Sequence, residues 1–242
     1  MRKTIREIEN CRSILSLIIR AGKEAANSFS AVKDYRAEIL FQKQEEIQNV
    51  YMATVQNISQ KMLAAAKELQ STFEDELEPK VDTASTLGMV MQYLATADGA
   101  FTPGRLQHLI RPLQAAGDLN GLILIKELAE TKNSVEATLV DFGNVALADV
   151  LVKRIRQQMQ LLQTNTIANI KTCDCSGIIK AVKGQEDPDL NILLQVGPGF
   201  VVQGTGAFLA NIEENVNSLA GMIERTKAGE PEPESTLNWM PE

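Results

Sequence analysis

The sequence predicts a mainly α-helical protein, an elongated bundle of long, coiled-coil-like helices with a small helical cluster. Aromatic residues make up only 5% of the 242 residues, whereas Ala, Leu, Ile and Gln are abundant, which favours helices packed through aliphatic side chains. Residues 1–78 contain no proline and a single glycine, Gly22, so no strong breaker interrupts helix formation there. The hydrophobic content of 44% allows a sizeable core.

The first 32 residues carry apolar or small side chains at alternating spacings of three and four residues. This heptad pattern predicts a helix whose packing stripe forms a left-handed supercoil with a partner. The stripe comprises Ile8, Cys11, Leu15, Ile18, Gly22, Ala25, Phe29 and Val32.

A second stripe begins near residue 47 with spacings of four, four and three, an eleven-residue repeat. A helix over residues 31–78 would be roughly 70 Å long, so this stripe needs a long partner. We expect both stripes to carry packing interactions, within the chain or with another subunit. The second stripe comprises Ile47, Tyr51, Val55, Ile58, Met62, Ala66, Leu69, Phe73 and Leu77.

Residues 27–34, NSFSAVKD, lie where the pattern changes and offer several cap-forming side chains. They are compatible with the corner of a helical hairpin or with a bend in one rod, and we favour the corner. Pro79 then ends the second helix, because proline cannot continue it easily. We expect four consecutive regions: 1–80, long helical; 81–133, a compact helical cluster; 134–226, a long helix, a glycine-rich segment and a final helix; and 227–242, an acidic flexible tail.

The third region begins with a predicted long helix over 135–170, with a stripe that includes Leu151, Ile155 and Met159. Two β-prone runs around Gly197-Pro198-Gly199 then predict a short β-hairpin near 190–203. The Pro- and Glu-rich tail cannot form a core. Its Trp239, the only tryptophan, is either a docking residue for a partner or an aromatic without a role.

The stretch KTCDCSG, residues 171–177, holds two of the three cysteines, Cys173 and Cys175. Metal-binding thiolates are usually two to four residues apart and need four ligands, whereas a disulfide between these cysteines would close a strained ring. We therefore favour a helix-ending turn of small residues over a metal or redox site. No metal site and no cofactor are expected.

His108, the only histidine, lies between Arg105 and Arg111 without a neighbouring nucleophile, so an ordinary histidine is favoured over a catalytic one. The pair Gly204 and Gly206 superficially resembles a dinucleotide-binding turn. Leu209 occupies the place of the third glycine, however, and no second strand follows. We therefore expect no catalytic residue and no cofactor-binding residue.

The net charge of −7 disfavours nucleic-acid binding, for which the best local patch, Lys153–Arg156, is small. No secretory signal is evident, and three cysteines do not form a disulfide framework, so we expect a cytoplasmic protein. No run approaches the roughly 18 apolar residues that span a bilayer.

These observations favour a non-enzymatic structural or assembly protein that acts through self-association or packing against a partner protein. The organisation is similar in kind to helical assembly proteins, including those of virions and their scaffolds, although no motif identifies a family. One alternative is a membrane-interacting helical protein that uses the apolar segment 190–210, and an unrecognised enzyme is the other. The three differ in the exposure of 190–210 and in whether His108 meets carboxylates or a thiol.

Overall fold

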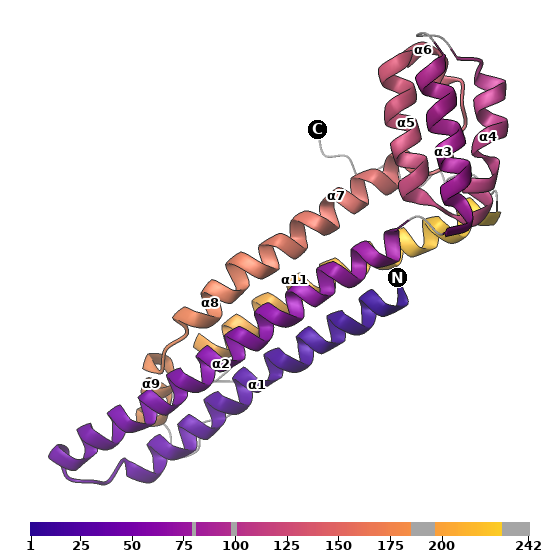
Figure 1. The fold of residues 1–242 in the computed structure, drawn as a ribbon. Helices are drawn as coiled ribbons and strands as arrows, with labels where there is room; N and C mark the ends of the chain where they lie inside the picture. Colours follow the sequence, from indigo (N-terminus) through magenta and orange to yellow (C-terminus); the bar gives the residue numbers. More distant parts are fainter. Residues whose placement is uncertain (79–80, 98–100, 185–196, 229–242) are drawn as a thin grey trace. The chain divides into compact units, whose positions relative to one another are not determined.

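The computed structural model describes residues 1–78, 81–97, 101–184 and 197–228, and every regular element in these ranges is a helix (Figure 1). The mainly α-helical fold predicted from the sequence is confirmed. The chain forms two compact units, each built from segments that are distant in the sequence. Unit 1 comprises Met1, Phe73–Ile155 and Asn215–Glu242, and unit 2 comprises Arg2–Thr72 and Arg156–Glu214.

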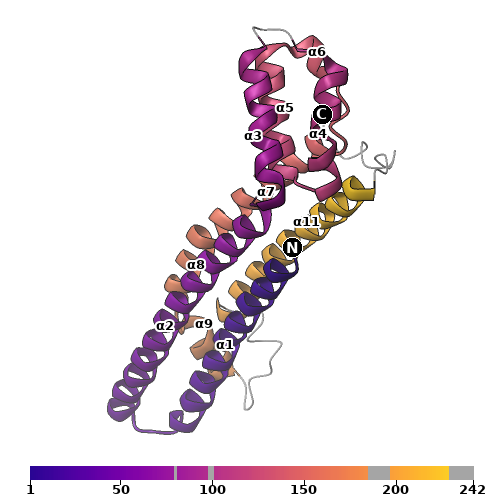
Figure 2. The same ribbon diagram turned by 45° about the vertical axis from the view of Figure 1, so that its right-hand side comes forward.

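Unit 2 contains a helical hairpin, in which α1 (Arg2–Val32) and the larger part of α2 (Ala37–Leu77) run side by side in opposite directions (Figures 1 and 2). The corner occupies residues 33–36, slightly later than the sequence suggests. Helix α1 continues through Ser28, whose hydroxyl bonds to the carbonyl of Glu24. It also continues through Phe29, which is buried. Burial of this aromatic ring therefore outweighs the capping tendency of its polar neighbours.

Almost all side chains of the two expected stripes are buried within the folded chain. Seven of the eight residues of the first stripe are buried, and Val32 beside the corner is half-buried. In the second stripe Ile47 is half-buried and every residue from Tyr51 onward is buried. The side chains that the sequence marks for packing therefore find their partners within this chain.

The remainder of unit 2 comes from segments late in the sequence. They belong to α7 (Val145–Leu161), the π-helix η1 (Leu162–Thr166), α8 (Ile167–Thr172), α9 (Ser176–Gly184) and α11 (Gly197–Ala228). Gln163 in η1 donates to the side chain of Gln70 in α2, with an N–O distance of 2.6 Å. Arg12 in α1 forms an ion pair with Glu213 in α11 at 2.5 Å. Polar contacts at the edges of the core thus fix the register of the helices.

The helices between residues 81 and 138 belong to unit 1. They are α3 (Val81–Thr96), α4 (Pro103–Ala116), α5 (Leu119–Lys132) and the short α6 (Ser134–Thr138). Asp118 caps α5, accepting from the backbone N–H of Gly121 at 2.9 Å. The hydroxyl of Thr83 donates to the same buried carboxylate at 2.7 Å, which joins α3 to α5. An added Cβ at Gly121 would lie 2.9 Å from Asp118 Oδ2, so glycine leaves room for the cap.

The long helix expected over 135–170 is interrupted, and that prediction is wrong for residues 139–144. A turn containing Gly143, whose φ of 69° belongs to the left-handed region, separates α6 from α7. Helix α4 holds the turn in place, since Asp141 N–H donates to Gln107 Oε1 at 2.7 Å. The side chain of Gln114 donates to the carbonyl of Asp141 at 2.8 Å. These tertiary contacts outweigh the helical pattern of the sequence.

The short β-hairpin expected near 190–203 is contradicted where the structure describes it. Residues 197–203 form the first turns of α11, while 190–196 lie outside the described residues. Pro198 suits the start of a helix because its fixed φ is helical and the first N–H groups have no partner there. Its ring packs against α1, where a Cβ added at Gly22 would be 3.2 Å from Pro198 Cγ. Packing on α1 thus overrides the β propensity of the valines.

We expect Phe29→Ala to lower the free energy of unfolding by about 3–5 kcal/mol, because it empties a closely packed site. Phe29 is 2% exposed, whereas Phe41, on the same hairpin, is 72% exposed. The matched variant Phe41→Ala should change stability by less than about 0.5 kcal/mol. Chemical denaturation followed by circular dichroism measures both values. Equal losses in the two variants would contradict the packing described for unit 2.

Candidate functional site

The KTCDCSG stretch forms the turn between α8 and α9, which agrees with the interpretation favoured from the sequence. The backbone N–H of Cys173 closes the last turn of α8 on the carbonyl of Ile170 at 3.2 Å. Asp174 then caps the start of α9, accepting from Ser176 N at 3.0 Å and from its hydroxyl at 2.7 Å. The side chains of Asp174 and Ser176 thus hold the turn in place.

The three thiols are free and buried, and their surroundings keep them protonated. Burial, with a smaller contribution from Asp174, raises the pKa of Cys175 to about 12. Burial also raises the pKa of Cys173, although its hydrogen bond with the Tyr51 hydroxyl, 3.4 Å away, acts in the opposite direction. The pKa of Tyr51 is raised by burial and by this bond. Thiols in this state are poor nucleophiles and poor metal ligands.

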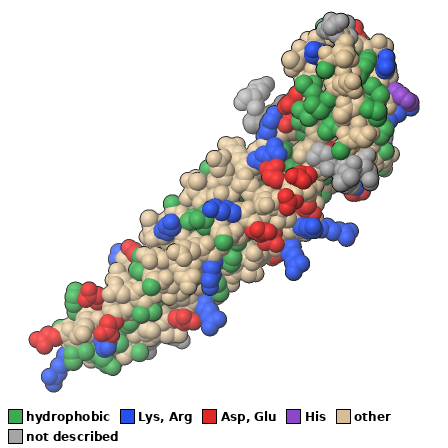
Figure 3. All heavy atoms as spheres, in the orientation of Figure 1, with side chains coloured by type: hydrophobic (Ala, Val, Ile, Leu, Met, Phe, Trp, Pro, Cys, Tyr) green, Lys and Arg blue, Asp and Glu red, His purple; other side chains and the backbone are tan. Residues whose placement is uncertain are grey.

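His108 lies exposed on α4, and Figure 3 shows the only histidine side chain at the surface of the molecule. The described residues contain no group of three or more His, Cys, Asp or Glu side chains that could hold a metal ion. Gly204 and Gly206 lie within α11, so they do not form the turn between a strand and a helix that a dinucleotide would need. Trp239 lies outside the described residues.

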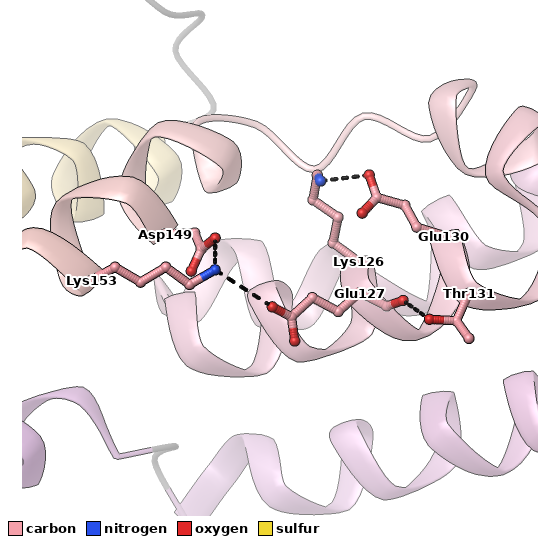
Figure 4. Close-up of polar contacts among 6 residues, drawn as sticks. All are labelled: Lys126, Glu127, Glu130, Thr131, Asp149 and Lys153. Carbon is pink, nitrogen blue, oxygen red and sulfur yellow. Dashed lines mark hydrogen bonds and ion pairs between the residues drawn. The ribbon is translucent and has the colours of Figure 1, made fainter.

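The small basic patch at 153–156 includes a lysine that is bound to acidic side chains. Lys153 in α7 forms ion pairs with Asp149 at 2.7 Å and with Glu127 of α5 at 3.9 Å (Figure 4). Lys126 pairs with Glu130 one turn along α5, at 2.6 Å. Acidic partners reduce the positive potential that Lys153 could offer to a phosphate.

An open groove of about 530 Å³ lies in unit 2 beside the π-helix. One wall comes from η1 and α8, with the polar side chains of Asn165, Asn169 and Thr172 at helical spacing. The opposite wall comes from the first turns of α11, including Phe200, which is 72% exposed. The groove therefore combines amide and hydroxyl groups with apolar side chains.

A different surface remains uncovered on the first turns of α2. No side chain from Ala37 to Val50 is buried, although this stretch includes several large apolar residues. Figure 3 shows hydrophobic side chains at the α1–α2 corner, with acidic and basic side chains beside them. The exposed apolar residues here are Tyr35, Ile39, Phe41 and Val50.

Four residues of this stretch share one face of α2, which we call the α2 flank: Ile39, Lys43, Glu46 and Val50. Their spacings of four, three and four place them in one row along the helix. Ile39 is 49% exposed and Val50 is 68% exposed. Between them Lys43 and Glu46 form an ion pair at 2.6 Å, and the hydrogen bond with Glu46 raises the pKa of Lys43.

The row continues along α2 into a second, smaller groove of unit 2, about 230 Å³ in volume. Thr54, Asn57 and Lys61 line it from α2. Leu17 and Glu24 are among the residues that line it from α1. The α2 flank and this groove thus form one continuous strip beside the hairpin.

Reasoning from the sequence selected the buried stripes and missed the α2 flank. Of the selected residues, Ile47 is half-buried, and the others that the structure describes are buried. The buried residues are Ile8, Leu15, Ile18, Phe29, Tyr51, Val55, Ile58, Met62, Leu69 and Phe73. The signal for the flank was present in Ile39 and Val50, two apolar residues that lie off the main stripe and are eleven residues apart.

Raising the pH above 9 is expected to lower the free energy of unfolding. Burial, and to a lesser degree Glu7, raises the pKa of Cys11 from its ordinary 9.0 to about 12. The neutral thiol therefore contributes stability below pH 9 that is lost as the pH rises through 12. The slope is about 1.4 kcal/mol per pH unit for each such group.

Urea unfolding at pH 8, 9, 10 and 11 measures this slope. The variant Cys11→Ala should be less stable than the natural protein at pH 8. Its free energy of unfolding should then fall by about 1.4 kcal/mol less per pH unit, because one buried thiol is missing. Identical slopes in the two proteins would show that Cys11 does not contribute to the alkaline loss.

The described residues therefore provide structural cysteines, an amphipathic groove, and an exposed strip on α2 that combines apolar and charged side chains. No described helix contains an apolar stretch long enough to cross a membrane. Comparison of the chain with protein-family models, with curated proteins and with solved structures found no match.

Proposed function

We propose that this protein is a non-enzymatic helical assembly protein that acts through self-association or through packing against a partner protein. The observation that carries the proposal is the exposed apolar surface at the α1–α2 corner. Soluble proteins keep large apolar side chains exposed in groups mainly where another molecule covers them. Here Ile39 and Val50 are exposed on one face of α2, and Tyr35 is exposed in the corner that precedes it.

The burial of the two main stripes defines what kind of association is proposed. Residues such as Met62 and Leu69 are 0% exposed, so a second chain could reach them only if the bundle opened. Association in the folded state therefore uses the outer faces of the helices. Such interfaces bury less apolar surface than a core stripe, which favours reversible assembly.

The free thiols favour a reducing compartment such as the cytoplasm for this assembly. Cys11, Cys173 and Cys175 are all unpaired and buried. A chain that folds without disulfides needs no oxidising environment.

Measurement of molar mass over a wide concentration range tests the proposal. Sedimentation equilibrium from micromolar to millimolar protein should show a mass above that of one chain, rising with concentration. Addition of a cell extract depleted of this protein, followed by crosslinking, tests the alternative of a different partner. A single-chain mass at every concentration, with no crosslinked partner, would overturn the proposed function.

The membrane-interacting alternative rests on one observation, the exposed Phe200 near the start of α11. If this segment met a membrane, purified protein would release dye from anionic phospholipid vesicles, and Phe200→Ser would reduce the release. Phe41→Ser is the matched control, because its ring is equally exposed but lies on the hairpin corner. No release at micromolar protein would remove this alternative.

A further inference from the structure

The α2 flank has a two-fold pattern of residue types along its own length. Ile39 and Val50 are its two ends, and Lys43 and Glu46 lie between them. The midpoint between residues 44 and 45 is equally far from both members of each pair. Turning the helix end over end about that midpoint thus exchanges an apolar residue with an apolar one, and a cation with an anion.

We propose that the α2 flank binds the α2 flank of a second copy of this chain, antiparallel, about a two-fold axis at this midpoint. In this register Ile39 of each copy meets Val50 of the other, and Lys43 meets Glu46. The interface is isologous, since the same patch is used on both subunits. The inference rests on the proposed function, because it assigns self-association to one surface.

Charge complementarity identifies the occupant as a second copy. Lys43 and Glu46 already pair within one helix, at 2.6 Å. In the antiparallel dimer the four side chains form an alternating square, in which each cation has two acidic neighbours. A parallel pairing would instead place lysine beside lysine and glutamate beside glutamate, which is repulsive.

The surface next to the flank suits the same register. In this register the corner of the second copy, with its exposed Tyr35, comes opposite the groove that begins at Thr54. Tyr35 is 49% exposed, and the groove holds about 230 Å³. The dimer thus covers three of the four exposed apolar side chains of the corner, and Phe41 lies on another face of α2.

Charge reversal tests the pairing. Lys43→Glu gives the dimer four acidic side chains at its centre, and Glu46→Lys gives four basic ones, so each variant should lose self-association at least tenfold in dissociation constant. An equimolar mixture of the two variants should recover it, because each acidic flank then faces a basic one. Lys126→Glu breaks a comparable ion pair on α5 and is the matched control.

A crosslinking experiment tests the direction and register. The double variant Ile39→Cys/Val50→Cys should form a covalent dimer on mild oxidation, because positions 39 and 50 face each other across the axis. Each single variant should remain uncrosslinked, since two copies of one position are separated by roughly 16 Å along the helix, beyond the reach of a disulfide. The native cysteines are buried and give little background.

The outcomes separate this inference from the proposed function. If the natural protein associates, but the charge variants associate equally well and the double variant does not crosslink, the α2 flank is not the interface and assembly uses another surface. If the natural protein has the mass of one chain at every concentration, this dimer does not form. The expected result has three parts. Lys43→Glu and Glu46→Lys each weaken self-association, and an equimolar mixture of the two recovers it. Among the cysteine variants, only Ile39→Cys/Val50→Cys forms a covalent dimer.

Discussion

Two long helices have to bury their apolar stripes against segments of the same chain, and the other features of unit 2 depend on this constraint. Helices α1 and α2 contain 31 and 41 residues, and amphipathic helices in proteins gain most of their stability from tertiary packing. Each fully buried Leu, Ile or Phe contributes about 1.5–3 kcal/mol before the entropy of ordering is subtracted. The late segments η1, α8, α9 and the start of α11 supply the covering side chains, and polar contacts such as Gln163 with Gln70 set their register.

Much of the fold could be predicted because its core residues repeat with a helical period. The stripe from Ile8 to Phe29 and the stripe from Tyr51 to Leu77 are both buried as their spacing implies. The cap at Asp118 depends only on local chemistry, since a carboxylate just before a helix accepts from its first free N–H groups. The break at 139–144 could not be predicted, because glutamine side chains of α4 hold it from more than twenty residues away. A period in the sequence reports which face is buried, but not where tertiary contacts replace helical bonds.

The same distinction explains the outcome at the candidate site. Cys173 and Cys175 are candidates for a reactive site in the sequence because a free cysteine is reactive. In the structure burial raises the pKa of both thiols, and Asp174 caps the helix that follows. The sequence does not indicate the α2 flank, because Ile39 and Val50 are common apolar residues and only their exposure in the fold distinguishes them. Exposure depends on which neighbours the fold provides, so it cannot be read from spacing alone. Residues 39–50 are a candidate because the fold leaves all of their side chains at least partly exposed.

The π-helix η1 affects how this chain can change in length. A π turn closes its backbone hydrogen bonds one residue further along the chain than an α turn does, so it holds an extra residue within a continuous helix. Loss of one residue between Leu162 and Thr166 would convert the turn to α-helix and leave Ile170 facing the core. The same loss in α7 would rotate every later residue by about 100° around the axis and expose that side chain. The chain therefore has, at one defined point in a packed helix, a place where a deletion can be absorbed without repacking the core.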